Sequence, residues 1–287
     1  MEPGDVGPMA VQAATGVVDT VVADDDASVV AVRQALGHLT GRVEPGECAD
    51  QRRLRHLLPH SRVRSYDVRP IVETLADAGS VLELRPGFGR GIVTALARLG
   101  GRPMGLLAND PRHLGGAIDA ESADKAAAFL RLCETHRVPV VSLVDTPGFM
   151  VGPEAERTGM VRRFGALYVA GARLTVPLCV VVLRKAYGLG AMAMAGGDLR
   201  APLLTVAWPT GEFGPMSLEG AVRLGYRREL EALSDPTVRQ ARFEELVAES
   251  YERGKALNVA TVFEIDDVID PADTRTVLIR ALMSAEG

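Results

Sequence analysis

The chain has 287 residues, of which 47% are hydrophobic and 24% charged, and its formal net charge is −5. This hydrophobic content is sufficient for a large core, so we expect a globular protein with one large or two smaller domains. The negative net charge and the low aromatic content of 5% argue against a nucleic-acid-binding protein, which needs a basic face and stacking side chains.

Membrane and export signals are not evident in the sequence. The apolar runs are shorter than the roughly 18 residues that a membrane-spanning helix needs. The N-terminus, Met1-Glu-Pro-Gly-Asp5, lacks the basic and apolar regions of a secretory signal peptide. We therefore expect no membrane segment and a cytoplasmic location.

The three cysteines, Cys48, Cys133 and Cys179, are odd in number and widely spaced, and the last two stand in apolar runs. This pattern favours reduced core thiols over disulfides. Cys48 with His56 and His60 is the only conceivable metal-ligand cluster in the sequence. Its spacing matches no standard site, so no metal is expected.

The first predicted elements are a short strand at 16–22 and a helix at 27–39, which acidic residues at 24–26 precede. Carboxylates are favourable at the positive N-terminus of a helix. A polar linker follows at 41–51. The next strands are predicted at 80–84, 91–97, 102–108, 138–144 and 176–183, and the next helices at 122–136, 160–171 and from 191 onward.

This alternation of strands and helices predicts an α/β layered fold, with helices packed over a mostly parallel sheet. From residue 217 the chain is rich in Arg, Glu and Leu. That composition favours amphipathic helices at 227–233 and 242–251, with a contribution to assembly or a plain solvated surface as the two explanations. A last helix is predicted at 272–282.

A strand, a glycine turn and a helix follow one another three times. The turns are Gly115-Gly116, before a helix that Ser122 is expected to cap, then 145–149, and Gly188 to Ala191. At the third turn, free N–H groups at the positive start of a helix would converge on one point, as in an oxyanion hole. A tight turn that needs glycine only for its backbone conformation explains the same pattern.

Three other motifs are incomplete. The segment Asp145-Thr-Pro-Gly148 resembles the magnesium segment of GTPases, but no Gly-x-x-x-x-Gly-Lys-Ser/Thr stretch accompanies it. No Gly-x-Ser-x-Gly elbow is present, so a triad hydrolase is not expected. The tetrapeptide at 191–194 resembles a biotin-attachment site, but Ala193 replaces the lysine that would carry biotin.

Six ordered segments between Arg52 and Leu282 carry a family resemblance. They are Tyr66-Asp67 with the helix that follows, 109–116 with 118–119, 129–133, 144–149, 184–188, and 207–210 ahead of 220–222. Together they resemble the C-terminal half of the carboxyltransferase subunit of biotin-dependent acyl-CoA carboxylases, in the crotonase superfamily. The resemblance implies a crotonase-like (ββα-spiral) layered fold.

The resemblance also implies a domain division and partners. Residues 1–45 resemble the closing strand and helix of the family's N-terminal half, and residues 46–287 resemble the C-terminal-type domain. The chain is therefore expected to be the carboxybiotin-side half of a split carboxyltransferase. A separate CoA-binding half, a biotin carboxyl carrier protein and a homo- or hetero-oligomer are the implied partners.

In this family, biotin is present as carboxybiotin on the carrier, and a coenzyme A thioester accepts the carboxyl group. The oxyanion hole for the biotin oxygen would be the Gly188–Ala191 turn. Without an alignment gap the donors are Leu189 and Gly190, and with a one-residue shift they are Gly190 and Ala191. The implied substrate-binding residues are Gly115, Gly116, Asp145, Gly148, Phe149, Tyr187 and Met192.

Met192 stands where propionyl-preferring relatives often carry Asp, so it is the candidate for acyl selection among short acyl-CoAs such as the precursor of malonyl-CoA. Packing in a helix core explains Met192 equally well. Two other functions remain open for the whole chain. One is a biotin-independent acyl-CoA or acyl-carrier-protein decarboxylase, and the other is a non-catalytic assembly subunit.

Overall fold

A computed structural model describes residues 6–285, and in these residues the strands form one eight-stranded sheet. Its order is β1-β2-β3-β4-β5-β6-β8, and β7 pairs with β5 beside this path. The strands are β1 (Leu82–Leu84), β2 (Ile92–Leu99), β3 (Arg102–Asn109), β4 (Val140–Thr146), β5 (Leu178–Tyr187), β6 (Leu204–Ala207), β7 (Glu212–Gly214) and β8 (Asp267–Val268).

The sheet is antiparallel at one edge and parallel from β3 onward. The turn between β2 and β3 consists of Gly100 and Gly101, which both have positive φ. A two-residue hairpin needs this backbone conformation, and glycine adopts it without strain. The prediction of a mostly parallel sheet is confirmed, and the hairpin accounts for the antiparallel edge.

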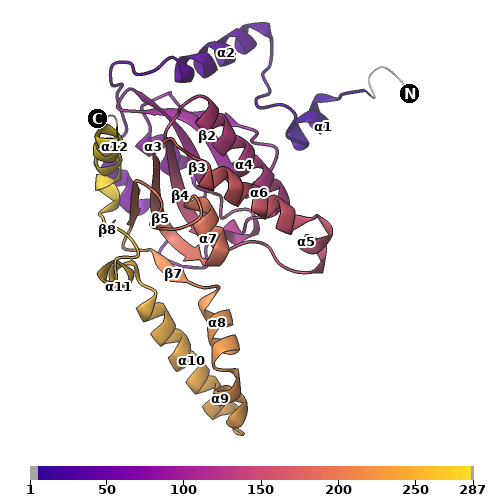
Figure 1. Cartoon of the computed structure of the whole chain (residues 1–287), viewed down its shortest axis with the longest axis vertical. Helices are drawn as coiled ribbons and strands as arrows, with labels where there is room; N and C mark the ends of the chain where they lie inside the picture. The colour runs from indigo at the N-terminus through magenta and orange to yellow at the C-terminus, as the bar shows by residue number, and fades with distance from the viewer. Residues whose placement is uncertain (1–5, 286–287) are drawn as a thin grey trace.

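Helices cover both faces of the sheet (Figure 1). One face carries the core beneath α4, α6 and α7, and the other carries the core beneath η2, α3 and α12. The α-helices are α1 (Met9–Ala14), α2 (Asp25–Leu39), α3 (Arg69–Leu75), α4 (Ala120–Thr135), α5 (Pro153–Arg157), α6 (Met160–Ala172), α7 (Gly188–Met194), α8 (Leu218–Gly225), α9 (Arg227–Ala232), α10 (Pro236–Arg253), α11 (Ala256–Thr261) and α12 (Thr274–Ser284). The 3-10 helices are η2 (Gln51–His56), η3 (Leu114–Gly116) and η4 (Pro271–Asp273).

Strand β5 shows why the sheet needs both helical layers. Val180 and Val182 belong to the core on the α4 side, whereas Val181 and Leu183 belong to the core on the α3 side. Side chains alternate between the faces of a strand, so a continuous apolar run fills two cores at once. The run that the sequence assigned to a strand is therefore the centre of the sheet.

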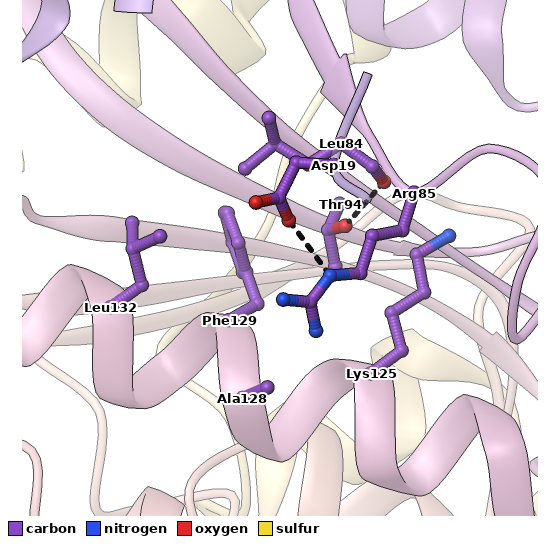
Figure 2. A pocket seen from close by; sticks show the side chains of 8 residues that line it. All are labelled: Asp19, Leu84, Arg85, Thr94, Lys125, Ala128, Phe129 and Leu132. Carbon is purple, nitrogen blue, oxygen red and sulfur yellow. Dashed lines mark hydrogen bonds and ion pairs between the residues drawn. The ribbon is translucent and has the colours of Figure 1, made fainter. Parts of the chain in front are cut away.

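The strand predicted at 16–22 does not form. Val17, Val21 and Val22 are exposed, and Asp19 contacts Arg85, the residue directly after β1. The Asp19 carbonyl accepts a hydrogen bond from the Arg85 N–H at 2.7 Å, and the Asp19 carboxylate pairs with the Arg85 guanidinium at 2.7 Å. Figure 2 shows this pair over a small cavity of about 20 Å³. A single backbone contact does not make a ladder, so the segment stays irregular.

Two helix starts also differ from prediction. Helix α4 begins at Ala120, and its N-cap is Asp119, whose carboxylate accepts from the Ser122 N–H at 2.8 Å. The capping role expected of Ser122 is therefore wrong, because a carboxylate one turn earlier takes it. Helix α7 begins at Gly188, not at Ala191, so the glycines belong to its first turn.

The helices expected in the C-terminal part do form. Helices α8, α9 and α10 project from the body as an arm (Figure 1), with a small core of Val222, Leu230 and Leu246. At the base of the arm, the Arg62 guanidinium lies 3.8 Å from the centre of the Tyr251 ring. The arm is thus a local extension with its own packing. The division of the chain at residue 45 stays a prediction.

Candidate active site

Three glycine turns meet at one edge of the sheet. They follow β3, β4 and β5, which are neighbouring parallel strands. The loops after the first two strands are joined by two hydrogen bonds, from the Ile118 N–H to the Gly148 carbonyl at 3.0 Å and from the Met150 N–H to the Ile118 carbonyl at 2.9 Å. Ligands of open α/β sheets bind outside the carboxyl ends of the strands, so this edge is the candidate site.

Glycine is required at two points where these turns approach one another. A Cβ atom on Gly116 would lie 2.3 Å from the Asp145 carbonyl oxygen, and one on Gly190 would lie 2.7 Å from the Gly148 Cα. Such distances are far below van der Waals contact, so only glycine fits. A Cβ atom on Gly115 would meet nothing within 4 Å, although its φ of 65° favours glycine.

Two neighbouring residues, Pro215 and Tyr168, hold the turn at the start of α7. Gly188 has a φ of 56°, and a Cβ atom there would lie 2.6 Å from the Pro215 carbonyl oxygen. The Leu189 carbonyl accepts a hydrogen bond from the Tyr168 hydroxyl at 2.6 Å. Helix α6 therefore holds the first turn of α7 through Tyr168, a residue that the sequence did not single out.

Phe149 belongs to an aromatic group beside this turn. Its ring stacks on Phe164 with a centroid separation of 3.9 Å and lies 6.2 Å from the Tyr168 ring. The rings connect the loop after β4 with α6. Phe149 thus lies next to the candidate site. Its ring contacts the ring of Tyr168, whose hydroxyl donates to the Leu189 carbonyl.

Leu189 and Met192 form the exposed face of α7, with 64% and 39% of their surfaces accessible. Residues three apart lie on the same side of a helix. Ala191, Ala193 and Met194 on the other side are buried. Packing in the helix core therefore does not explain Met192, since the core position in this helix is taken by Met194.

Asp145, at the end of β4, is fully buried. Its Oδ2 accepts hydrogen bonds from the Tyr66 hydroxyl at 2.9 Å and from the Arg184 Nε at 3.0 Å. Its Oδ1 accepts from the Lys185 N–H at 3.2 Å. Burial and the Asp145 charge raise the pKa of Tyr66, which keeps this hydroxyl a donor. The carboxylate predicted to bind substrate contacts the chain's own donors in this structure.

A β-bulge directs Arg184 and Lys185 toward Asp145. The β4–β5 register pairs Val144 with Val182 but Thr146 with Ala186, so β5 has extra residues between these pairs. Bulges redirect side chains and are common beside active sites. Residues 184–188 form one of the segments that carry the family resemblance, but the sequence pattern predicted no role for Arg184 or Lys185. Two charged residues directly after a buried apolar run could have indicated that Arg184 and Lys185 belong to the site.

Tyr187 is buried at the end of β5, and its hydroxyl donates to the Glu212 carboxylate at 3.0 Å. Burial, followed by the charge of Glu212, raises the pKa of Tyr187, so this hydroxyl is also a permanent donor. Glu212 in turn lies 3.3 Å from the Arg62 guanidinium at the base of the arm. Tyr187 therefore links the candidate site to the arm.

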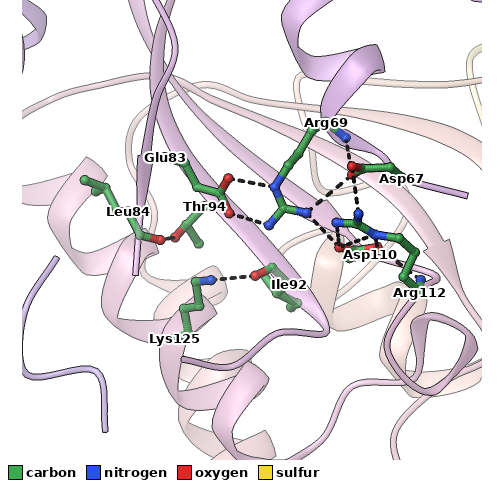
Figure 3. Close-up of polar contacts among 9 residues, drawn as sticks. All are labelled: Asp67, Arg69, Glu83, Leu84, Ile92, Thr94, Asp110, Arg112 and Lys125. Carbon is green, nitrogen blue, oxygen red and sulfur yellow. Dashed lines mark hydrogen bonds and ion pairs between the residues drawn. The ribbon is translucent and has the colours of Figure 1, made fainter. Parts of the chain in front are cut away.

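An ion-pair cluster anchors the start of the loop between β3 and α4 (Figure 3). The Arg69 guanidinium contacts Glu83 at 2.5 Å and Asp110 at 2.8 Å. Arg112 pairs with Asp110 at 2.9 Å and with Asp67 at 2.8 Å. Burial opposes ionisation of Asp110, but hydrogen bonds from Arg112 and Arg69 prevail and lower its pKa. These ion pairs hold the first residues of the loop that contains the glycine turn at 115–116.

The loop has a second anchor at its far end, where His113 Nε2 lies 2.8 Å from the Asp119 carboxylate.

Within residues 6–285, no three His, Cys, Asp or Glu side chains lie close enough together to hold a metal ion. Cys133 and Cys179 are buried free thiols, as predicted, and burial raises the pKa of each to about 12; Cys48 is free and exposed. No helix in the same residues is both long and apolar enough to cross a bilayer.

The sequence matches the carboxyl transferase domain family over residues 5–286. The chain therefore belongs to the carboxyl transferase domain family. A curated relative, the methylmalonyl-CoA carboxyltransferase 12S subunit of Propionibacterium freudenreichii subsp. shermanii, is 36% identical over 285 residues, covering 96% of this chain and 54% of the relative. The chain spans about half the length of the curated relatives that it matches.

Two solved structures share the fold. One, described as a single-chain, multi-domain long-chain acyl-CoA carboxylase, superposes with a TM-score of 0.90 at 56% identity and covers 98% of this chain and 28% of that chain. The other is a transcarboxylase 12S hexamer with methylmalonyl-CoA and methylmalonic acid bound, with a TM-score of 0.92, 33% identity, and coverage of 100% and 56%. The crotonase-like α/β fold predicted from the sequence is thus confirmed.

Proposed function

We propose that this chain provides the carboxybiotin side of an acyl-CoA carboxyltransferase, which moves a carboxyl group from carboxybiotin to an acyl-CoA. Membership of the carboxyl transferase domain family supports this function. One observation carries it: the first turn of α7 lies at the carboxyl edge, packed so closely on Gly148 that only glycine fits at position 190. Donors held this rigidly are pre-organised for a developing oxyanion.

The donors that fit best are the N–H groups of Leu189 and Gly190. In a helix capped by Tyr187, these groups belong to the first turn and have no intrahelical acceptor, whereas the N–H of Ala191 reaches the carbonyl of the cap residue. The free N–H groups of Leu189 and Gly190 therefore favour the ungapped alignment. The partial positive charge of the helix start adds to the attraction for an oxyanion.

The residues around this turn fit a biotin ring delivered by a carrier protein. Leu189 and Met192 offer an exposed apolar face, and the space beside Gly115 is open. Carboxybiotin would supply the carboxyl group and a ureido oxygen on which negative charge develops. The chain's own part is to bind the ring and to donate N–H groups to that oxygen. Loss of one such donor typically lowers turnover by about 100-fold to 1,000-fold.

The thioester side of the reaction is assigned to a CoA-binding half, either on another segment of the same protein or on a separate chain. A biotin carboxyl carrier protein and an oligomeric assembly complete the proposal. Helix α2 supports it, because Val29, Val30, Val32 and Leu36 are each at least half exposed. Exposed apolar faces of this kind mark interaction surfaces.

The test is transfer of a radiolabelled carboxyl group from a carboxylated biotin carrier to acetyl-, propionyl- or a long-chain acyl-CoA. This chain combined with a CoA-binding half should transfer the label, and avidin should abolish the transfer. This chain by itself should transfer little. Decarboxylation of malonyl-CoA by this chain alone and insensitive to avidin would replace the proposal by a biotin-independent decarboxylase, and no turnover in the combination would indicate an assembly subunit.

A further inference from the structure

Lys185 joins two of the glycine turns. It lies in the β5 bulge, three positions before Gly188. Its Nζ donates a hydrogen bond of 2.7 Å to the Gly115 carbonyl and lies 3.5 Å from the Asp145 Oδ1. Its backbone N–H donates to the same Oδ1 at 3.2 Å. Lys185, on the strand that leads into α7, thus contacts both the loop after β3 and the end of β4.

The Lys185 contact fixes one peptide plane of the glycine turn. The Gly115 carbonyl accepts from Lys185, and on the other side of the same peptide the Gly116 N–H donates to the His113 carbonyl at 2.9 Å. Both glycines have positive φ, 65° and 91°, and glycine restricts its own backbone less than any other residue does. The lysine therefore provides one of the two hydrogen bonds that hold this peptide.

The surroundings of Lys185 allow its hydrogen bond to be removed without disturbing the hydrophobic core. Its side chain is 18% exposed, so it lies at the edge of the site and not within either core cluster. Asp145 offsets its charge, and Arg184 and Glu212 are the other charged groups that act on it. Methionine matches the length of the lysine stem, so a Lys185→Met variant keeps the packing and loses the donor.

We propose that Lys185 is a positioning residue for carboxyl transfer: its ammonium group fixes the Gly115 carbonyl and thereby the distance between the Gly115-Gly116 turn and the first turn of α7. This inference rests on the proposed function of the α7 turn. A misplacement of about 1 Å in a catalytic arrangement lowers turnover by up to about 100-fold. The role is assigned to the lysine's hydrogen bond, not to contact with the transferred group.

The test compares Lys185→Met, Lys185→Arg and the matched control Lys255→Met in the complete carboxyltransferase. Lys255 is an exposed lysine that pairs with Glu252 outside the site. We expect Lys185→Met to lower kcat about 10-fold to 100-fold with an unchanged KM for acyl-CoA. Lys185→Arg should restore most of kcat, since guanidinium also donates to a carbonyl. Lys255→Met should behave as the parent does.

Hydrogen exchange of the amides at 113–118 supplies a readout that does not depend on activity. Lys185→Met should accelerate exchange there and leave exchange in α4 unchanged. A loss of kcat without faster exchange would assign Lys185 to direct substrate contact and overturn positioning. Parent-like kcat and exchange in Lys185→Met would overturn it as well. If the parent transfers no carboxyl group, the proposed function fails, whereas the exchange comparison still decides whether the lysine holds the loop.

Discussion

The Asp145 carboxylate and the Arg184 guanidinium form a buried ion pair, with 3.0 Å between Oδ2 and Nε. Arg184 also donates through Nη1 to the Arg64 carbonyl at 2.9 Å. The pair therefore connects the ends of β4 and β5 with the segment that carries Tyr66. The Asp145 carboxylate thus supports the site through contacts within the chain, and its expected role in substrate binding stays a prediction.

Asp145→Ala should destabilise the protein by roughly 3–5 kcal/mol, because it leaves the Arg184 charge buried and uncompensated. Denaturant unfolding measures the change. The double variant Asp145→Ala/Arg184→Met should recover part of the loss, giving a coupling energy in the double-mutant cycle. Additive losses, or a single-variant cost below about 1 kcal/mol, would show that the pair is not the support described here.

Gly116→Ala should be much more harmful than Gly115→Ala. A methyl group at position 116 collides with the Asp145 carbonyl oxygen, whereas at position 115 it enters open space. Both residues have positive φ, 65° and 91°, so alanine is strained in both variants, and the contact with the Asp145 carbonyl adds to the strain at position 116 only. Unfolding free energy and carboxyl transfer should both be measured. Equal effects would mean that backbone strain, and not the contact with β4, explains the glycines.

Met192→Asp should fold with a stability close to that of the parent, because Met192 is 39% exposed and the charge stays in contact with water. If Met192 faces the acyl group, the ratios of kcat/KM among acetyl-, propionyl- and butyryl-CoA should change by about 10-fold in Met192→Asp and less in Met192→Ala. One methylene in an apolar pocket is worth only about 1–3 kcal/mol. Unchanged ratios would remove the specificity role.

Lys125 is buried at 1% exposure, and its Nζ donates to the Ile92 carbonyl at 2.7 Å (Figure 3). Burial lowers the pKa of this lysine to about 8. Because the folded-state pKa lies below the ordinary value, the unfolded chain binds more protons between pH 8 and about 10.5. Stability should therefore rise with pH across this window, and the charged lysine costs roughly 3 kcal/mol below pH 8.

The measurement is the unfolding free energy of the parent and of Lys125→Met at pH 7, 9 and 10.5. The parent should gain roughly 3 kcal/mol relative to the variant between the first and last pH. The parent and Lys125→Met share all other titratable groups, so the contributions of those groups to the pH dependence cancel in the difference. Lys255→Met, which removes an exposed lysine, should show no such relative gain. A pH-independent difference for Lys125→Met would contradict the lowered pKa.

The sequence predicted the central elements well because their patterns are local. The run predicted as a strand from Val176 to Leu183 forms β5, which begins at Leu178 and continues to Tyr187. The glycine turns at 115–116, 145–149 and 188–191 each lie at or after the end of a strand. The strand expected at 16–22 failed because valine content alone does not provide a partner strand. The capping role expected of Ser122 failed because Asp119, a stronger competitor, lies one turn before it.

The sequence by itself determined the α/β layering, the family and the three glycine turns, since periodicity and short motifs are properties of neighbouring residues. Only the tertiary structure decided how the turns pack on one another, that Asp145 faces Arg184 and Tyr66, and that Lys185 reaches the Gly115 carbonyl. These contacts join residues 39 to 79 positions apart. Parallel strands bring their ends together only through long crossovers, so no local pattern encodes which side chains meet there.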